Sequence, residues 1–212
     1  MTTMGIEKRF VLDVGDSIRE ELRRFLGEEQ IVLASGSPRR REILRLAGVD
    51  CIVDPPDVDE SVPEGAEPIE FAVRLAKEKL AATNGTGQLT VAADTIVVLG
   101  SIILGKPTDA ADAVRMLRTL SGKTHFVITA LAVRDKNGRV IAQADKTFVR
   151  FRNLDEDAIR SYVESKEPMD KAGAYGIQGM GELLVDGLEG SLHNVIGFPI
   201  EMFVRMMREL RS

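Results

Sequence analysis

The segment IVLASGSPRRREILRLAG limits the possible folds of this chain more than any other. Its apolar start, residues 31–34, predicts a short buried strand that leads at once into a Ser-Gly-Ser-Pro turn. Ser37 suits a helix N-cap and Pro38 the first helical position, so we predict a helix over 38–47 with Gly48 beyond it. A strand, tight turn and helix in this order form the arrangement in which α/β proteins bind anions at a helix N-terminus.

Three consecutive arginines, Arg39 to Arg41, stand in the first turn of this predicted helix. A helix N-terminus already carries partial positive charge and normally attracts Asp or Glu. The chain as a whole is acidic, with a net charge of −5, so the arginines do not reflect its composition. They indicate a ligand that supplies the negative charge. We expect Arg39 and Arg40 to face this ligand and Arg41 to point to solvent.

The rest of the chain alternates between helical and extended patterns. We predict strands at 51–53, 89–100 and 183–185, a β-hairpin across Asn137-Gly138, and helices at 16–26 (capped by Asp16), 68–83, 109–121, 155–167 and from Pro199. Strand–helix units followed by an antiparallel hairpin favour an α/β fold with a mixed sheet.

Composition excludes several classes of function. The acidic net charge argues against broad nucleic-acid binding, and the single cysteine rules out an internal disulfide and suits a reducing cytosol. No apolar run reaches the roughly 18 residues of a membrane span. The N-terminal region is charged where a signal peptide needs an apolar stretch. We therefore expect a soluble cytoplasmic protein with no membrane partner.

Asp94 interrupts the otherwise apolar stretch at 89–100. An ionised carboxylate inside such a strand is costly unless a cation, a metal or a donor accompanies it. One reading ends the strand near Ala93, so that Asp94 begins a turn. The other places a carboxylate at the strand's end, where it lines a cleft as a metal ligand or a general base.

The sequence GSIILGKP matches part of a phosphate-binding P-loop but departs from it at the end. A P-loop continues with Ser or Thr, whose hydroxyl holds Mg²⁺, whereas Pro107 supplies none. The Ile-Ile-Leu interior is more typical of a strand, and the next helix begins after Thr108. A P-loop ATPase or kinase is thus disfavoured. Lys106 stays a candidate cation for a phosphate, with a solvated turn as the alternative.

Three further regions contain candidate ligands. The acidic loop before residue 68 has Glu60 among several carboxylates that are mostly solvated. At least one of Lys77 and Lys79 lies on a surface face. The segment DKAGAYGIQG either brings Gln178 to read a base edge or is a plain glycine-rich loop. The two histidines are far apart, so zinc is not expected, and no motif supports covalent catalysis.

The candidates form a complementary set of charges. Its cations are Arg39, Arg40, Lys79, Lys106 and Lys171, and its anions are Glu60 and Asp94. Cations that neutralise phosphate oxygens, with carboxylates that hold Mg²⁺ or Mn²⁺, suit a polyphosphate ester bound with a divalent metal. One carboxylate would take the proton from an attacking water.

Five fragments in order together resemble one family. LASGSPRRREIL, ADTIVVLGSIILGKP, LSGKTHFVITA, EPMDKAGAYGIQGMG and NVIGFP are similar to motifs of the Maf-like nucleoside triphosphate pyrophosphatases, over about residues 31–210. The resemblance implies a hydrolase that converts a nucleoside triphosphate to the monophosphate and pyrophosphate. It also implies the elongated, two-lobed α/β fold with a mixed sheet shared with inosine triphosphate pyrophosphatases, with the nucleotide in a cleft between lobes.

The resemblance assigns expected roles to individual residues. Asp94 would accept the proton, and with Glu60 hold the metal. Arg39, Thr95 and Gln178 fall where the family sets substrate choice. Other pocket positions match Ser35, Arg40, Glu60, Lys79 and Lys106.

The motif combination is similar to the branch that acts on dTTP and UTP, including modified pyrimidine nucleotides, and lacks the Ser-Pro-Trp-Arg motif of the 7-methyl-GTP branch. Family members are usually homodimers. Residues 1–30 would be a helical extension and 31–212 the pyrophosphatase domain. A different class of function stays open: a non-catalytic nucleotide-binding regulator of cell division, without turnover.

Overall fold

A single mixed β-sheet organises the computed structural model, which describes residues 10–85 and 87–211. Its strands are β1 (Ile31–Ala34), β2 (Cys51–Val53), β3 (Thr90–Leu99), β4 (Ile102–Leu104), β5 (Thr124–Arg134), β6 (Val140–Phe151) and β7 (Val185–Glu189). Their order is β2-β1-β3-β5-β6-β7, and β4 pairs with β3 off this path. β1 is parallel to β2 and β3, while the other pairs are antiparallel. The predicted mixed sheet is confirmed.

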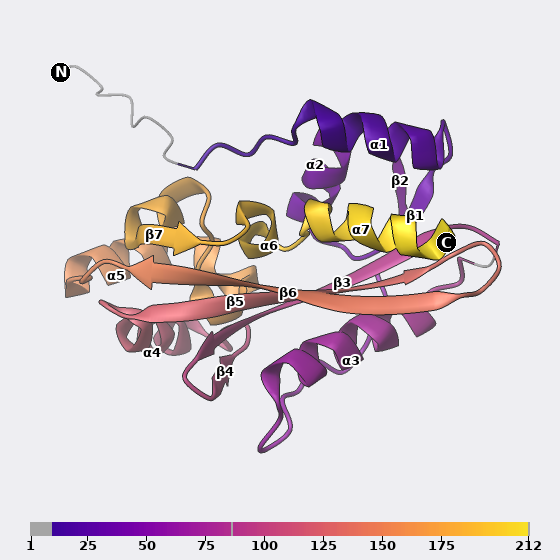
Figure 1. The fold of residues 1–212 in the computed structure, drawn as a ribbon. Helices are drawn as coiled ribbons and strands as arrows, with labels where there is room; N and C mark the ends of the chain where they lie inside the picture. The colour runs from indigo at the N-terminus through magenta and orange to yellow at the C-terminus, as the bar shows by residue number, and fades with distance from the viewer. Residues whose placement is uncertain (1–9, 86, 212) are drawn as a thin grey trace.

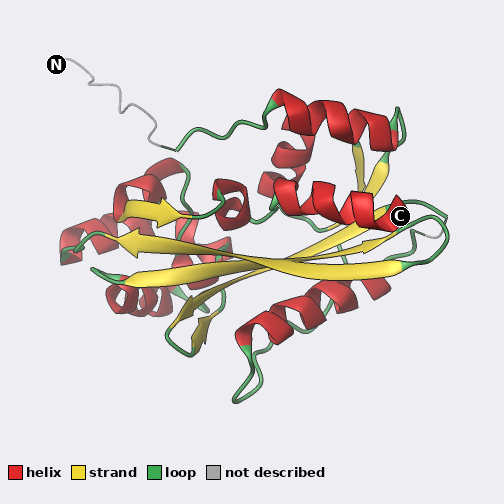
Figure 2. Ribbon diagram, viewed as in Figure 1, coloured by secondary structure: helices red, strands yellow, loops and turns green. Residues whose placement is uncertain are grey.

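Helices cover both faces of this sheet (Figures 1 and 2). They are α1 (Asp16–Leu26), α2 (Pro38–Leu46), α3 (Pro68–Ala81), α4 (Ala110–Leu120), α5 (Glu156–Glu164), α6 (Leu192–Ile196) and α7 (Ile200–Arg211), with 3-10 turns η1 (Glu167–Asp170), η2 (Ala172–Ala174) and η3 (Gly179–Leu184). α3 lies against one face and α7 against the other, with α1 packed outside α7. Helices gather at both ends of the long β5–β6 hairpin, which gives the elongated, two-lobed form. No helix in the described part of the chain is long and apolar enough to span a membrane.

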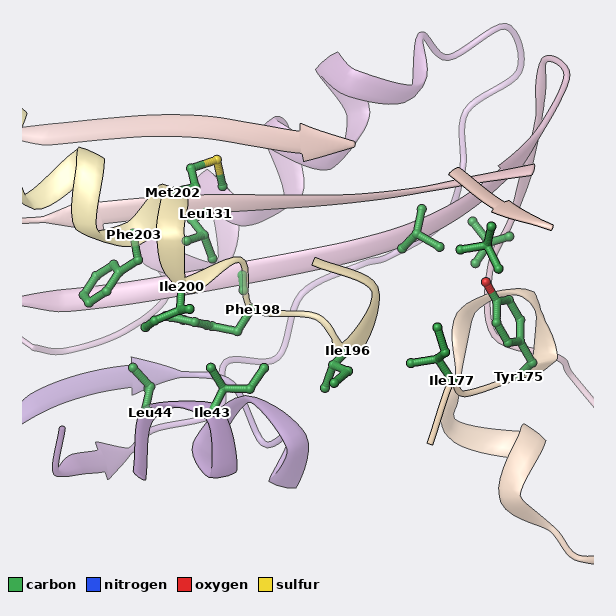
Figure 3. Close-up of a cluster of buried hydrophobic side chains, with 14 of the residues drawn as sticks. Ile43, Leu44, Leu131, Tyr175, Ile177, Ile196, Phe198, Ile200, Met202 and Phe203 are labelled. Carbon is green, nitrogen blue, oxygen red and sulfur yellow. The ribbon is translucent and has the colours of Figure 1, made fainter. Parts of the chain in front are cut away.

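The alternation of side chains along β3 divides the core into two clusters. Val91 and Ala93 join the larger cluster, part of which Figure 3 shows, with Phe198 and Phe203 among the labelled side chains. Ala92 and other residues of even number pack under α3 in the second cluster. Successive residues of a strand point to opposite faces, so Asp94 points toward α3 and Thr95 toward the larger cluster.

A gap along one edge of β3 leads to the candidate site. β1 pairs with residues 90–92 of β3, and β4 pairs with 97–99 on the same edge. In the described structure no strand pairs with residues 93–96 on that edge. Asp94 and Thr95 lie in this gap, where polar side chains from both faces of the sheet have room to meet.

Several predicted boundaries differ from the structure. β3 confirms the predicted strand at 89–100, but it continues through Asp94, so the strand does not end near Ala93 and the carboxylate is not at a strand's end. The N-cap of α1 is Gly15, and Asp16 is its first helical residue. Most of the predicted strand at 183–185 is the 3-10 turn η3, after which β7 begins at Val185. α6, a single turn capped by Ser191, was not predicted.

The predicted extension, residues 1–30, includes α1, whose Leu22 and Leu26 are buried in the larger core cluster. The first nine residues lie outside the described residues. The predicted absence of a signal peptide concerns this region in part, so it stays a prediction. The division at residue 30 stays a prediction.

Candidate active site

A cavity of about 870 Å³ opens at the gap beside β3. The nine residues predicted for the site all line it: Ser35, Arg39, Arg40, Glu60, Lys79, Asp94, Thr95, Lys106 and Gln178. They come from the turn after β1, from α2, the acidic loop, α3, β3, the turn after β4 and the glycine-rich segment, which are spread along the sequence. The structure therefore brings together the whole predicted set, and Arg41 is exposed as expected.

The turn between β1 and α2 is held by Ser35 rather than by Ser37. Ser37 occupies the N-cap position, but its side chain makes no capping hydrogen bond. Instead the Ser35 hydroxyl oxygen accepts from the Ser37 backbone N–H at 3.3 Å. The predicted N-cap position of Ser37 is thus confirmed, although the hydroxyl that holds the turn is that of Ser35.

Arg40 is anchored on three sides by other segments. Its Nε donates to the Gly197 carbonyl oxygen at 2.9 Å, Nη1 to Ser35 Oγ at 2.7 Å, and Nη2 to Thr95 Oγ1 at 3.1 Å. Burial lowers the pKa of the guanidinium from its ordinary value. The three contacts fix its orientation at the cavity wall. Its remaining N–H groups are suited to phosphate or carbonyl oxygens.

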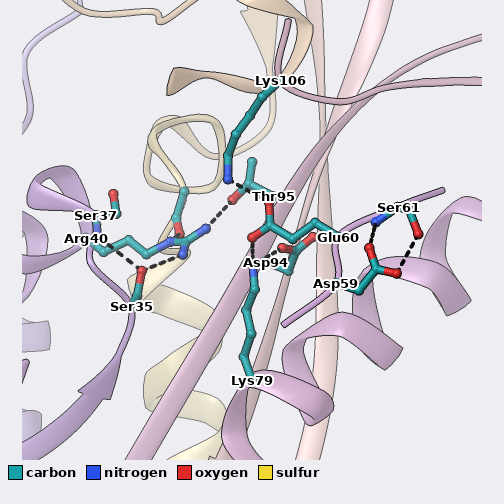
Figure 4. A network of polar contacts seen from close by, with 11 residues as sticks. Ser35, Ser37, Arg40, Asp59, Glu60, Ser61, Lys79, Asp94, Thr95 and Lys106 are labelled. Atoms are coloured by element: carbon teal, nitrogen blue, oxygen red, sulfur yellow. Dashed lines mark hydrogen bonds and ion pairs between the residues drawn. The ribbon is translucent and has the colours of Figure 1, made fainter. Parts of the chain in front are cut away.

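Lys79 joins the two predicted carboxylates (Figure 4). Its Nζ donates to Asp94 Oδ1 and to Glu60 Oε1, each at 2.6 Å. The side chains of Lys79 and Asp94 are 9% and 7% exposed, so this is a buried ion pair. The lysine charge explains how an apolar strand accommodates Asp94 in its interior. Lys77, by contrast, is exposed, as expected for at least one of the pair.

Glu60 also holds Lys106, whose Nζ donates to Glu60 Oε2 at 2.6 Å. Burial raises the pKa of the Glu60 carboxyl, but the hydrogen bonds and charges of Lys106 and Lys79 more than offset this and lower it to about 2. Glu60 is therefore ionised across the physiological pH range. The Lys106 side chain is 56% exposed and lies at the mouth of the cavity, in reach of a ligand. The residues before it form β4, in agreement with the strand reading and against a P-loop.

Arg39 and the glycine-rich segment form the opposite side of the cavity. Arg39 Nη1 donates to Asp170 Oδ2 at 3.3 Å, and Lys171 Nζ donates to Asp170 Oδ1 at 2.6 Å. Gln178 follows in the same segment and lines the cavity. Arg39, on α2, is thus bridged to η1 through the Asp170 carboxylate.

Two buried tyrosines hold the glycine-rich segment in place. The Tyr162 hydroxyl accepts from the Gly176 backbone N–H at 3.1 Å, and the Tyr175 hydroxyl contacts His125 Nε2 at 2.7 Å. Burial raises the pKa of Tyr162 to about 12 and lowers that of His125 to about 4, so both are neutral at pH 7. The segment is therefore more than a plain loop, since these contacts fix the backbone near Gln178.

Asp94 and Glu60 are carboxylates at the cavity that could hold a metal. Among the described residues, no group of three or more His, Cys, Asp or Glu gathers to hold a metal by itself. Mg²⁺, however, is usually held by one or two carboxylates together with substrate phosphates. Asp94 Oδ2 accepts no hydrogen bond from the described residues and Asp94 lines the cavity, so Asp94 and Glu60 fit such a shared site. The histidines engage Tyr175 and Glu201.

Sequence reasoning missed three residues that orient the site: Asp170, Thr129 and Asn194. Asp170 holds Arg39 and Lys171. Thr129 lies opposite Thr95 in the β3–β5 register, and their hydroxyl oxygens are 3.0 Å apart. Asn194 is fully buried and contacts Thr129. A buried asparagine in the otherwise apolar NVIGFP motif was the available signal.

Comparison with known proteins matches this geometry to one family. The family model described as Maf-like protein covers residues 30–210. A dTTP/UTP pyrophosphatase of Bacillus mycoides (strain KBAB4) is 43% identical over 185 residues, which are 86% of this chain and 96% of that protein. A dTTP/UTP pyrophosphatase of Aquifex aeolicus (strain VF5) is 45% identical over 183 residues, 85% of this chain and 95% of that protein.

The solved structure of the Staphylococcus aureus Ham1 protein covers 86% of this chain and 100% of its own, with 14% identity and a TM-score of 0.46. That score indicates only a loose similarity. The family model and the relatives at 43–45% identity are far stronger, because they extend over most of the chain, including the residues that line the cavity. The chain belongs to the Maf family.

Proposed function

We propose that this chain hydrolyses nucleoside triphosphates, with dTTP and UTP as substrates, to the nucleoside monophosphate and pyrophosphate. The observation that carries the proposal is Asp94, a carboxylate only 5% exposed at the wall of a cavity lined by basic side chains. A buried acid beside clustered cations suits the hydrolysis of an anionic substrate. The names of the relatives supply the substrate class.

The cations would bind the triphosphate and stabilise the charge that develops on it. Arg40, held rigidly by three protein contacts, costs little reorganisation when phosphate oxygens arrive. Lys106 and Arg39 are more exposed and are now paired with Glu60 and Asp170. They would exchange these carboxylates for phosphate oxygens as the ligand enters.

Asp94 would act as the general base. A water between the carboxylate and the α-phosphorus forms the new phosphorus–oxygen bond and gives its proton to Asp94. The bond from the α-phosphorus to the α,β-bridging oxygen breaks, and pyrophosphate leaves with that oxygen and the electron pair. Lys79 keeps the carboxylate oriented through its 2.6 Å contact with Oδ1, which leaves Oδ2 without a hydrogen-bond donor from the described residues.

Asp94 and Glu60 would hold a divalent cation, Mg²⁺ or Mn²⁺, together with the substrate's phosphate oxygens. Such a cation supplies additional neutralisation of the phosphate charge. We further propose that the protein acts in the cytoplasm as a homodimer, as the family resemblance implies. Sedimentation of the purified chain tests the assembly.

Product analysis tests the proposed reaction directly. Purified protein with Mg²⁺ or Mn²⁺ should release pyrophosphate and dTMP from dTTP in equal amounts, and a chelator should abolish the release. Orthophosphate as the only product would contradict the mechanism. Nucleotide binding with no loss of triphosphate over time would instead favour the non-catalytic regulator of cell division.

A further inference from the structure

A continuous chain of hydrogen bonds runs from the cavity wall into the core behind it. Arg40 Nη2 contacts Thr95 Oγ1 at 3.1 Å (Figure 4), Thr95 Oγ1 contacts Thr129 Oγ1 at 3.0 Å, and Thr129 Oγ1 contacts the Asn194 carbonyl oxygen at 2.8 Å. Thr129 and Asn194 are both fully buried. Neither touches the cavity, so neither has a direct role in ligand binding.

The donor and the acceptor of every hydrogen bond in this series follow from the groups at its two ends. Arginine has no acceptor, so Arg40 donates to Thr95. A backbone carbonyl has no donor, so Thr129 donates its single hydroxyl proton to Asn194. Thr129 then has only lone pairs to offer Thr95, and the Thr95 proton must point toward Thr129. Any other assignment places two acceptors face to face at hydrogen-bond distance inside the core.

Asn194 is held too firmly to adjust to a different arrangement. Its Oδ1 accepts from the Thr129 backbone N–H at 3.0 Å, and its Nδ2 donates to the Val127 carbonyl oxygen and to Thr147 Oγ1, both at 3.0 Å. Its side-chain amide therefore bonds to the β5 backbone and to β6. The far end of the proton chain is thus rigid.

The backbone at Gly197 leaves room for the contact between Arg40 and Thr95. Gly197, whose carbonyl accepts from Arg40 Nε, has φ of 113°, in the region that favours glycine. A Cβ at this position would lie 3.1 Å from Thr95 Oγ1 and 3.6 Å from Arg40 Nε. The segment that contains Asn194 and Gly197 is therefore shaped around the Arg40–Thr95 contact.

The result at the cavity is a hydroxyl of fixed polarity. Thr95 Oγ1 donates its proton in the hydrogen bond to Thr129 and accepts from Arg40 with one lone pair. One lone pair and no proton are left for a ligand. Thr95 lines the cavity and is partly exposed. It can accept a hydrogen bond from a ligand N–H or O–H, and it would repel a ligand acceptor placed at the same point.

We propose that Thr129 and Asn194 are positioning residues that make Thr95 an obligate acceptor, so that the site selects a nucleotide that presents a donor there. This inference rests on the proposed function for its substrate class. dTTP and UTP share two such donors: the imide N3–H of thymine or uracil, and the 3′-hydroxyl of the sugar. Cytosine has an unprotonated N3 acceptor in place of the imide, which gives selection against it a physical cause.

Thr129→Val tests the chain because it removes the acceptor for the Thr95 proton while nearly preserving shape. The freed Thr95 hydroxyl can then rotate and donate. If the imide is read, the ratio of kcat/KM for UTP to that for CTP falls about tenfold, the size of one hydrogen bond. If the sugar is read, the ratio for dTTP to 2′,3′-dideoxythymidine triphosphate falls instead. Thr129→Ser, which keeps the hydroxyl, should stay within about twofold of the wild-type ratio.

Matched variants separate this role from general destabilisation. Thr90→Val removes another fully buried threonine hydroxyl, on β3 but remote from the chain of bonds, and should leave both ratios unchanged. In a Thr95→Val background, Thr129→Val should change neither ratio further, because it acts through Thr95. Should Thr129→Val fail to fold, Thr129→Ala removes the same hydroxyl with less crowding and carries the same expectation.

The proposal would be overturned if Thr129→Val left both kcat/KM ratios at their wild-type values. It would also be overturned if Thr129→Val lowered a ratio equally in the Thr95→Val background. So would a wild-type protein with no preference on either arm. If the wild type hydrolyses no triphosphate, the proposed function fails. The inference is then judged by calorimetry, as the ratio of Kd values for the α,β-imido analogues of dUTP and dCTP, which should approach one in Thr129→Val.

Discussion

The inner wall and the outer rim of the cavity contain similar charges in very different settings. The inner wall, Arg40, Lys79, Asp94 and Thr95, makes its contacts within the protein and is mostly buried. The outer rim, Arg39, Glu60, Lys106 and Asp170, forms ion pairs whose members are 30–63% exposed. Buried pairs lose much when one partner is removed, whereas exposed pairs exchange readily with water and ions. The wall is therefore organised before a ligand arrives, and the rim is free to rearrange around one.

The largest expected effect belongs to the inner wall. Asp94→Asn keeps the shape of the side chain but removes the proton acceptor, so kcat for dTTP should fall by about 10²–10⁴-fold. KM should change little, since the cations that bind the phosphates remain. Steady-state kinetics with pyrophosphate detection measure both. Activity within tenfold of the wild type would show that another group is the base.

A pair of lysine substitutions compares wall and rim in stability. Lys79→Met leaves the Asp94 charge buried without its partner and should lower the free energy of unfolding by about 3 kcal/mol. Lys106→Met, at a side chain 56% exposed, should cost less than about 1 kcal/mol. Denaturant titrations measure both.

The double variant Lys79→Met/Asp94→Asn is the control, because it removes both charges of the buried pair. It should recover about half or more of the loss seen in Lys79→Met. Equal costs for Lys79→Met and Lys106→Met would remove the distinction between wall and rim.

The smallest expected effect tests whether the rim exchanges its partners. Asp170→Asn removes the carboxylate that competes with phosphate for Arg39 and Lys171, so KM for dTTP should fall by up to about fivefold. Asp186→Asn breaks another exposed ion pair, with Arg150, away from the cavity and should leave KM unchanged. An unchanged or higher KM in Asp170→Asn would indicate that Asp170 holds Arg39 in its binding position.

The strand, turn and helix at residues 31–47 could be predicted because their signals are local. An apolar run, a Ser-Pro pair and a following glycine act on neighbouring residues, and the structure places β1 and α2 within a residue of the expected bounds. The resemblance of short motifs then added pocket positions on other elements. Each of these lies at the cavity, although their chemical roles stay proposals.

Asp94 shows why the rest could not be predicted. The predicted strand at 89–100 includes Asp94, yet both readings of the carboxylate placed it where a strand ends, because a charge in an apolar segment is costly by itself. β3 instead continues through it, since Lys79 from α3 supplies the opposite charge at 2.6 Å. The partner stands fifteen positions earlier on another element, and the pattern within the strand contains no trace of it.

The sequence by itself determined the mixed α/β class, the strand–turn–helix unit and the residue types that suit a polyphosphate, because these depend on periodicity, turn chemistry and charge. Only the tertiary structure decided which charges are neutralised and which face the cavity. Arg39 and Arg40 are neighbours in the chain, yet one reaches an exposed carboxylate and the other a buried chain of hydrogen bonds. Burial and hydrogen-bond direction are properties of contacts between distant segments, and those contacts exist only in the folded molecule.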